Sequence, residues 1–189
     1  MNKESLDDVL ANDKHEQKIK IEYAGAWIRT KASLFDGIVT APIGGLVIYN
    51  LLIVKSFPLV IFTTILIVLY KPLMEWRYKA TLGKMVCKIK VVNENQEFLT
   101  IDQAFGRSIP WIINHVLSLI SYYYIFQTEA FYKMNSIFNM EALSVSTPVE
   151  NANTVYFFIF LVILGSLVYD KRHQGFHDKI AKTLVIKKD

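Results

Sequence analysis

Four apolar blocks, separated by charged links, restrict what this chain can fold into. They run from about 27 to 54, 57 to 76, 108 to 127 and 154 to 169. A helix needs roughly 20 mainly apolar residues to cross about 30 Å of hydrocarbon, and the first block is long enough to do so with tilt to spare. The second and fourth need their flanking residues, and the third is amphipathic. Taken alone, the third block could also be a buried or interfacial helix.

The distribution of basic residues favours four crossings. If all four blocks span, 19 of the 21 Lys and Arg residues lie on one side and only Lys55 and Lys133 on the other. Basic residues are retained on the cytoplasmic side of a membrane. We therefore expect an all-α membrane protein with four transmembrane helices, located in the cell inner (cytoplasmic) membrane with both termini in the cytoplasm.

The link between the second and third blocks has strand character. Its segment "CKIKVV", residues 87–92, alternates and is rich in β-branched side chains. "NENQE" follows as a turn, after which "FLT" could pair back, and the tail "AKTLVIKK" is another short strand. We expect these pieces to form a small cytoplasmic β element of a membrane domain over 23–187. Residues 1–22 mix both charge signs and are predicted to be a flexible cytoplasmic segment.

A polar stripe runs along the first block. Arg29, Ser33, Asp36 and Thr40 fall on one helical face, with Asp36 about 10 Å deeper than Arg29. A charged Asp at a helix centre costs roughly 2.5–3.5 kcal/mol, so it must find a partner in protein or water. Small residues nearby predict close approach of another helix. The stripe fits either a structural ion pair or an oxygen-rich site for a proton or alkali cation.

Polar residues elsewhere are further candidates. In the third block, Asn114, His115 and Ser118 could bridge toward Asp36 or hydrogen-bond between helices. In the tail, His173 and His177 are four apart, as in a helical metal pair, but the intervening glycine weakens a helix and no third ligand is evident. We predict no metal site there.

Several function classes lack their signatures. The chain has no Gly-rich phosphate loop, no G-x-S-x-G elbow, no H-E-x-x-H and no CxxC, and Cys87 is its single cysteine. No nucleophile–base pair stands out, so we predict neither an enzyme nor a cofactor. The basic clusters flank the blocks, which indicates contact with membrane lipids, anionic ones in particular, and not with nucleic acid.

Three segments in order resemble the RDD family of small membrane proteins, named for one arginine and two aspartates. They are "YAGAWIRTKASLFDGIV", "TLGKMVCKIKVVNENQEFLT" and "DKRHQGFHDKIAKTLV", and the resemblance covers roughly 23–187. It maps the arginine to Arg29 and the first aspartate to Asp36. Asp170 and Asp178 both fit the second aspartate, and Asp178 is preferred.

The resemblance implies a membrane protein for which transport is the usual suggestion, with sodium/proton exchange proposed for some members. Our leading hypothesis is an ion transporter, a candidate Na⁺(K⁺)/H⁺ exchanger, in which the intramembrane Asp36 binds a proton or a cation and has Arg29 as its partner. Arg29 would favour the charged form of a nearby acid, or lock one conformation through Asp178 or Asp170. A homo-oligomer would supply further pore walls. The alternative is a non-transporting scaffold or assembly factor that docks another membrane protein or a lipid.

Overall fold

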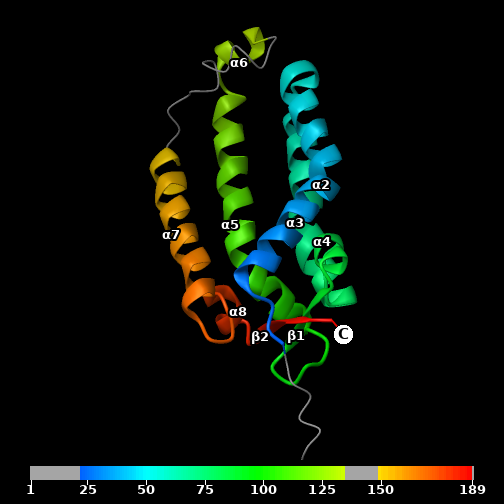
Figure 1. Cartoon of the computed structure of the whole chain (residues 1–189). Coiled ribbons are helices and arrows are strands. Elements are labelled where there is room, and N and C mark those ends of the chain that lie inside the picture. The colour runs from blue at the N-terminus through cyan, green and yellow to red at the C-terminus, as the bar shows by residue number, and fades with distance from the viewer. Residues whose placement is uncertain (1–21, 135–148, 189) are drawn as a thin grey trace, which may run out of the picture.

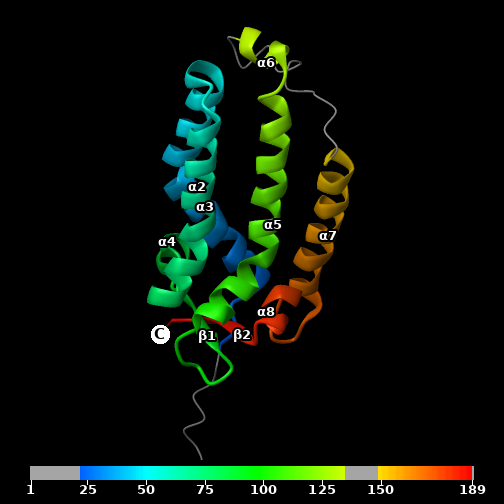
Figure 2. The ribbon, with the colours of Figure 1, turned by 180° about the vertical axis from the view of Figure 1, so that it is seen from behind.

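The structure, a computed structural model, describes residues 22–134 and 149–188. The predicted flexible segment 1–22 therefore lies outside the described residues, apart from Glu22. Four long helices run side by side along the molecule in both opposed views (Figures 1 and 2). They are α2 (Ala26–Tyr49), α3 (Phe57–Tyr78), α5 (Ile101–Ile125) and α7 (Glu150–Tyr169).

The short elements gather at the two ends of this bundle. At the end where the chain terminates lie α4 (Leu82–Val86), α8 (Phe176–Ile180) and the strands β1 (Ile89–Asn93) and β2 (Thr183–Lys187) (Figure 1). At the opposite end, α2 continues into a π-helical turn (Asn50–Val54), and α6 (Glu129–Lys133) follows α5.

Three of the described helices are long and apolar enough to cross a membrane. They are Ala26–Val54, Phe57–Tyr78 and Asn151–Tyr169, which cover the first, second and fourth predicted blocks. The third block forms α5, which begins several residues before the predicted span, at a capping box formed by Thr100 and Gln103. The helix α5 is long enough to cross a membrane but more polar than the other three helices, so its composition alone does not identify it as a transmembrane helix.

A two-stranded antiparallel sheet joins the loop after α4 to the C-terminal tail. Its register runs from Ile89 opposite Lys187 to Asn93 opposite Thr183. On the other edge of β2, Tyr23 bridges Ile186. The expectation that "FLT" would pair back onto "CKIKVV" is wrong, since the tail occupies β1 and Thr100 serves as the N-cap of α5.

Among the described residues, tight apolar packing is confined to three small clusters. The smallest lies on the sheet itself (Val92, Leu184, Ile186). Another joins the sheet to the ends of α2 and α5 that lie beside it (Ala24, Ala32, Ile89, Val91, Leu99, Ala104, Val185). The third lies at the opposite end, where α3, α5 and α6 meet (Val60, Ile125, Phe126, Phe131, Met134). Much of the surface between the clusters exposes large apolar side chains, as expected for helices that face lipid.

Candidate functional site

Asp36 lies in α2, and its carboxylate accepts three hydrogen bonds from neutral donors. The Tyr70 hydroxyl and the Gly83 amide donate to Oδ1 at 2.9 and 2.8 Å, and the Thr81 hydroxyl donates to Oδ2 at 2.6 Å. Tyr70 comes from α3, and the other two donors stand at the start of α4. Among the described residues, no cationic side chain forms an ion pair with Asp36.

The close approach to this part of α2 is made by Gly83 of α4. A Cβ added there would lie 2.1 Å from the Ala32 carbonyl oxygen and 2.9 Å from the Asp36 Cγ. We expected the small residues of α2 itself to admit a neighbouring helix, and that expectation is wrong for its glycines. A Cβ at Gly37, Gly44 or Gly45 would meet nothing within 4 Å.

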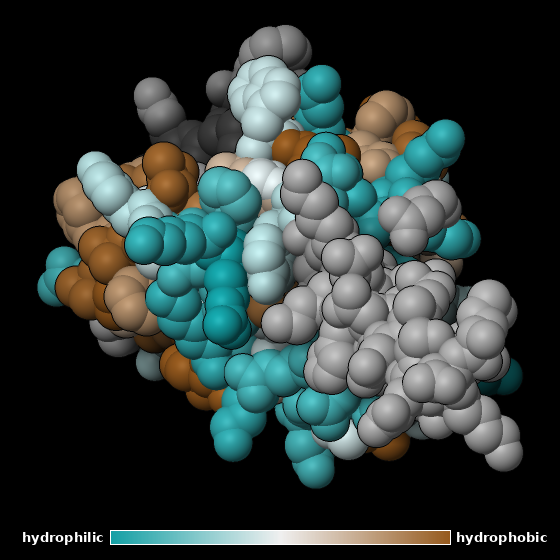
Figure 3. Space-filling model, turned by 60° about the horizontal axis from the view of Figure 1, so that its bottom comes forward, coloured by the Kyte–Doolittle hydropathy of each residue, from teal (hydrophilic) through white to brown (hydrophobic). Residues whose placement is uncertain are grey.

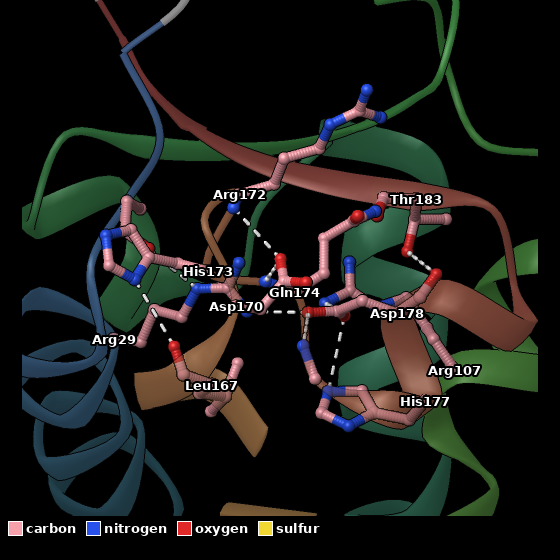
Figure 4. Close-up of polar contacts among 12 residues, drawn as sticks. Arg29, Arg107, Leu167, Asp170, Arg172, His173, Gln174, His177, Asp178 and Thr183 are labelled. Carbon is pink, nitrogen blue, oxygen red and sulfur yellow. Dashed lines mark hydrogen bonds and ion pairs between the residues drawn. The ribbon is translucent and has the colours of Figure 1, made fainter. Parts of the chain in front are cut away.

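Arg29 does not pair with Asp36; it reaches Asp178 instead (Figure 4). Its Nη1 lies 2.6 Å from Asp178 Oδ2, while its Nε donates to the Ala24 carbonyl at 3.0 Å. The side chain of Arg29 is only 10% exposed, so the protein itself surrounds most of the guanidinium. Asp178 therefore joins α8 to the first turn of α2.

Arg107 of α5 extends this pair into a buried ionic cluster. Its Nη2 lies 2.9 Å from Asp178 Oδ1, and its Nε lies 3.3 Å from Glu75 Oε2. Glu75, in the last turn of α3, also binds the ammonium of Lys84 from α4. Five side chains from five helices are thus linked, and both carboxylates are fully buried. We call Arg29, Glu75, Lys84, Arg107 and Asp178 the ionic cluster.

Burial and nearby charges shift the pKa values of Asp178 and Lys84 in the ionic cluster and of His177 beside it. Burial alone would raise the pKa of the Asp178 carboxyl, but Arg107 and Arg29 outweigh burial and hold it well below its usual range. Burial lowers the pKa of the Lys84 ammonium to about 8, although Glu75 opposes this. Beside Asp178, burial lowers the pKa of the His177 imidazole to about 4. His177 is therefore neutral near pH 7, and the cations paired with Asp178 are the two arginines.

Asp170 has a different environment from Asp178. It is the C-cap of α7 and lies outside the ionic cluster. Its Oδ2 accepts the amides of Arg172 and Gln174, both at 3.0 Å, and its Oδ1 binds Lys179 at 2.6 Å. The hydrogen bond from Lys179 is the largest of the effects that lower the pKa of Asp170 to about 2. The structure thus brings Arg29 together with Asp178, the preferred second aspartate, and Asp170 shapes the turn before α8.

Of the polar residues predicted to support Asp36, Thr40, His115 and Ser118 bond within their own helices. Ser33 is exposed, and the Thr40 hydroxyl donates to the Asp36 backbone carbonyl at 2.9 Å. In α5, His115 Nδ1 lies 2.9 Å from the Trp111 carbonyl, and Ser118 donates to the carbonyl of Asn114, whose side chain is exposed. The predicted bridge from α5 to Asp36 is therefore absent from the described contacts, because α4 fills that place.

Sequence reasoning missed two groups of residues. Glu75, Lys84 and Arg107 complete the ionic cluster, and Tyr70, Thr81 and Gly83 surround Asp36. A signal for the first group existed, since a carboxylate near the end of an apolar helix needs a cation. For the second group no spacing rule applies, because α3, α4 and α2 meet only in the folded chain.

The described residues contain no group of three or more His, Cys, Asp or Glu side chains placed to hold a metal ion.

In the comparisons with known proteins, the family model described as "RDD family" matches residues 23–182. No curated protein and no solved structure matches the chain.

Proposed function

Since the chain belongs to the RDD family, we propose that it is an ion transporter of the cation/proton exchange type, with Asp36 as the ion-binding residue. One observation carries this proposal. The Asp36 carboxylate is held by neutral donors, whereas the two fully buried acids of the ionic cluster are each paired with cations. A carboxylate without a counter-charge in an apolar helix is the group that a proton or cation would neutralise.

The chemistry around Asp36 suits this role. Two hydroxyl oxygens, of Tyr70 and Thr81, lie within 2.9 Å of the carboxylate. A hydroxyl can donate to a charged carboxylate, or rotate and present a lone pair to a bound cation. Carboxylate and hydroxyl oxygens are hard ligands, which fit Na⁺, K⁺ or H⁺ better than a soft transition metal.

In this mechanism Asp36 also links ion binding to the position of α4. Its charged form accepts the Gly83 amide at 2.8 Å and the Thr81 hydroxyl at 2.6 Å. A proton or cation on the carboxylate competes with these two donors, which loosens α4 from α2. Arg29 has a separate role in the proposal: its pair with Asp178 holds the adjacent ends of the bundle in one conformation.

The proposal includes four spans, with both chain ends in the cytoplasm of the cell inner membrane. In its support, α5 has 25 residues, about 37 Å at 1.5 Å each, and lies alongside α3 (Figures 1 and 2). Lys55, one of the two basic residues predicted to lie on the non-cytoplasmic side, binds the carbonyls of Tyr132 and Met134. This contact joins the link after α2 to the link after α5 at the end of the bundle away from the sheet. The end that bears the sheet gathers hydrophilic residues (Figure 3).

Flux in proteoliposomes tests the role of Asp36. A sodium or potassium gradient should drive a pH change inside vesicles that contain the wild-type protein. Asp36→Asn should abolish it, and Tyr70→Phe, which removes one oxygen from the site, should reduce it about tenfold, as expected for the loss of roughly 1–1.5 kcal/mol.

The matched control is Glu129→Gln, since this acid of α6 has a 92% exposed side chain. It should transport like the wild type. If folded Asp36→Asn protein transports at the wild-type rate, Asp36 is not the ion-binding residue.

The alternative is a non-transporting scaffold that docks another membrane protein or a lipid. It is favoured by the ionic cluster, in which Asp178 is paired with Arg29 and Arg107. Glu75 is paired with Lys84 and Arg107, so both acids are already neutralised, as in a structural lock. In that case pure liposomes should show no flux with the wild type, while Asp36→Asn should change the partners or the abundance of the protein in cells.

A further inference from the structure

The short helix α4 has an inverted polarity. Leu82, Met85 and Val86 are 41%, 41% and 62% exposed, while Lys84 is buried against Glu75. In a helix that faces water, the lysine would be exposed and the apolar side chains would point inward. The exposed positions follow the i, i+3, i+4 spacing of one helical face, so α4 presents an apolar face outward.

Helix α8 repeats this inversion independently. It exposes Phe176 and Ile180, 50% and 76%, and buries Asp178 completely. Lys179 is also exposed, but its ammonium is bound to Asp170 at 2.6 Å. Two short helices at the same end of the bundle thus share an inside-out pattern.

Helix α4 turns back along the helix that precedes it. The Leu82 amide donates to the Tyr70 hydroxyl at 3.1 Å, although α3 continues eight residues beyond Tyr70, or about 12 Å. In both ribbon views α4 lies beside the lower half of α2, and the sheet lies below both short helices (Figures 1 and 2). The same half of α2 also exposes apolar side chains, among them Leu34 and Phe35.

The amides at the start of α4 find their partners within the protein. The amides of Leu82, Gly83 and Lys84 donate to the Tyr70 hydroxyl, the Asp36 carboxylate and the Thr81 hydroxyl. The Met85 and Cys87 amides then donate to carbonyls of α4 and its N-cap. A segment inside a bilayer must satisfy its backbone groups in this way, because hydrocarbon offers no partners.

We propose that α4 and α8 are re-entrant elements whose exposed apolar faces contact the acyl chains of the inner leaflet. The apolar faces of α4 and α8 then continue the lipid-facing sides of the long helices, and the membrane–water boundary falls at the sheet. The length of α2 agrees with this placement: together with its π-helical turn it has 29 residues, about 43 Å, against about 30 Å of hydrocarbon. Lipid, and not water, seals the ionic cluster from outside.

Spin labels measure the depth of these faces directly. In a Cys87→Ser background, single cysteines at Val86, Met85 and Ile180 would be labelled in the full chain reconstituted in liposomes. Phe158→Cys, on the exposed apolar face of α7, is the lipid control, and Glu94→Cys, in the exposed turn after β1, is the water control. The ratio of relaxation by oxygen to relaxation by a water-soluble nickel chelate reports depth.

We expect all three test positions to resemble Phe158, with a ratio at least several-fold above that of Glu94. Ratios equal to that of Glu94 would overturn the proposal, because both helices would then lie in water. Low access to both reagents would also overturn it, since a second copy of the chain or another protein would then cover these faces. The inference rests on the proposed four-span placement but not on transport, and depth is measured without flux, so the two can fail separately.

Discussion

At the scale of single residues, the acids of the site are stabilised in two different ways. Asp178 and Glu75 are neutralised by arginine and lysine side chains, whereas Asp36 accepts hydrogen bonds from two hydroxyls and one amide. Removal of one partner from a buried ion pair costs about 3–5 kcal/mol, because the other charge is left unpaired. Arg107 limits this cost, since it contacts both Glu75 and Asp178.

The neutral state of His177 predicts a pH dependence of stability. Its pKa is lowered by burial to about 4 in the folded protein, against 6.5 for an unperturbed imidazole. Between these values the unfolded chain binds the proton and the folded protein does not. The stability that His177 contributes is therefore present above pH 6.5 and is lost as the pH falls toward 4, by roughly 3 kcal/mol in total.

Unfolding in detergent at about pH 7 and about pH 4.5 measures this loss. His177→Gln has no proton to gain, so its stability should fall much less over this interval. The pKa of Asp178 is held below its usual range, so the stability that Asp178 contributes is lost only at lower pH. This loss is the same in the wild type and in His177→Gln. An equal loss in wild type and variant would show that His177 does not cause the pH dependence.

At the scale of elements, α4 is held against α2 by the absence of a side chain at position 83. Gly83→Ala would place a methyl group 2.1 Å from a backbone oxygen of α2, which cannot move as a flexible side chain can. We expect a loss of about 1–3 kcal/mol from overpacking, together with loss of the Gly83 hydrogen bond to Asp36. Thermal unfolding in detergent measures the change.

Gly165→Ala in α7 is the matched control. A Cβ at this position would meet nothing within 4 Å, so the variant should gain up to about 1 kcal/mol from helix propensity. If both alanine variants have the same stability, the contact between α4 and α2 is looser than the structure describes.

At the scale of the whole molecule, the open question is on which side of the membrane each end of the bundle lies. We expect Tyr132→Cys, at an exposed position of α6, to react with an impermeant maleimide in intact cells. Glu94→Cys, near the sheet, should react only after the cells are opened. Both variants would carry Cys87→Ser.

This pair of labels isolates α5, because α5 is the one long helix between the two positions. The same labelling pattern at both positions would mean that α5 does not cross. In that case three spans would remain, and the two chain ends would lie on opposite sides.

Some residues of the site could be predicted from the sequence, but their partners could not. The polar stripe of the first block predicts Arg29 and Asp36 as site residues, the resemblance to a family adds Asp178, and the loop and tail are predicted to form strands. The partners were not predictable: Arg29 was considered as a partner of Asp36, yet it lies against Asp178, 149 positions away along the chain. Helical spacing describes neighbours on one helix, and these pairs form between helices.

The sequence by itself determined that long apolar segments form helices, because 20 or so apolar residues in a row leave few other ways to satisfy the backbone in lipid. It also determined which residue types carry charge within them. Only the tertiary structure decided which charges meet. Gly83 lets α4 lie on Asp36, and Arg107 of α5 then stands between Glu75 and Asp178. Such pairings depend on distances of a few ångströms between segments far apart in the chain.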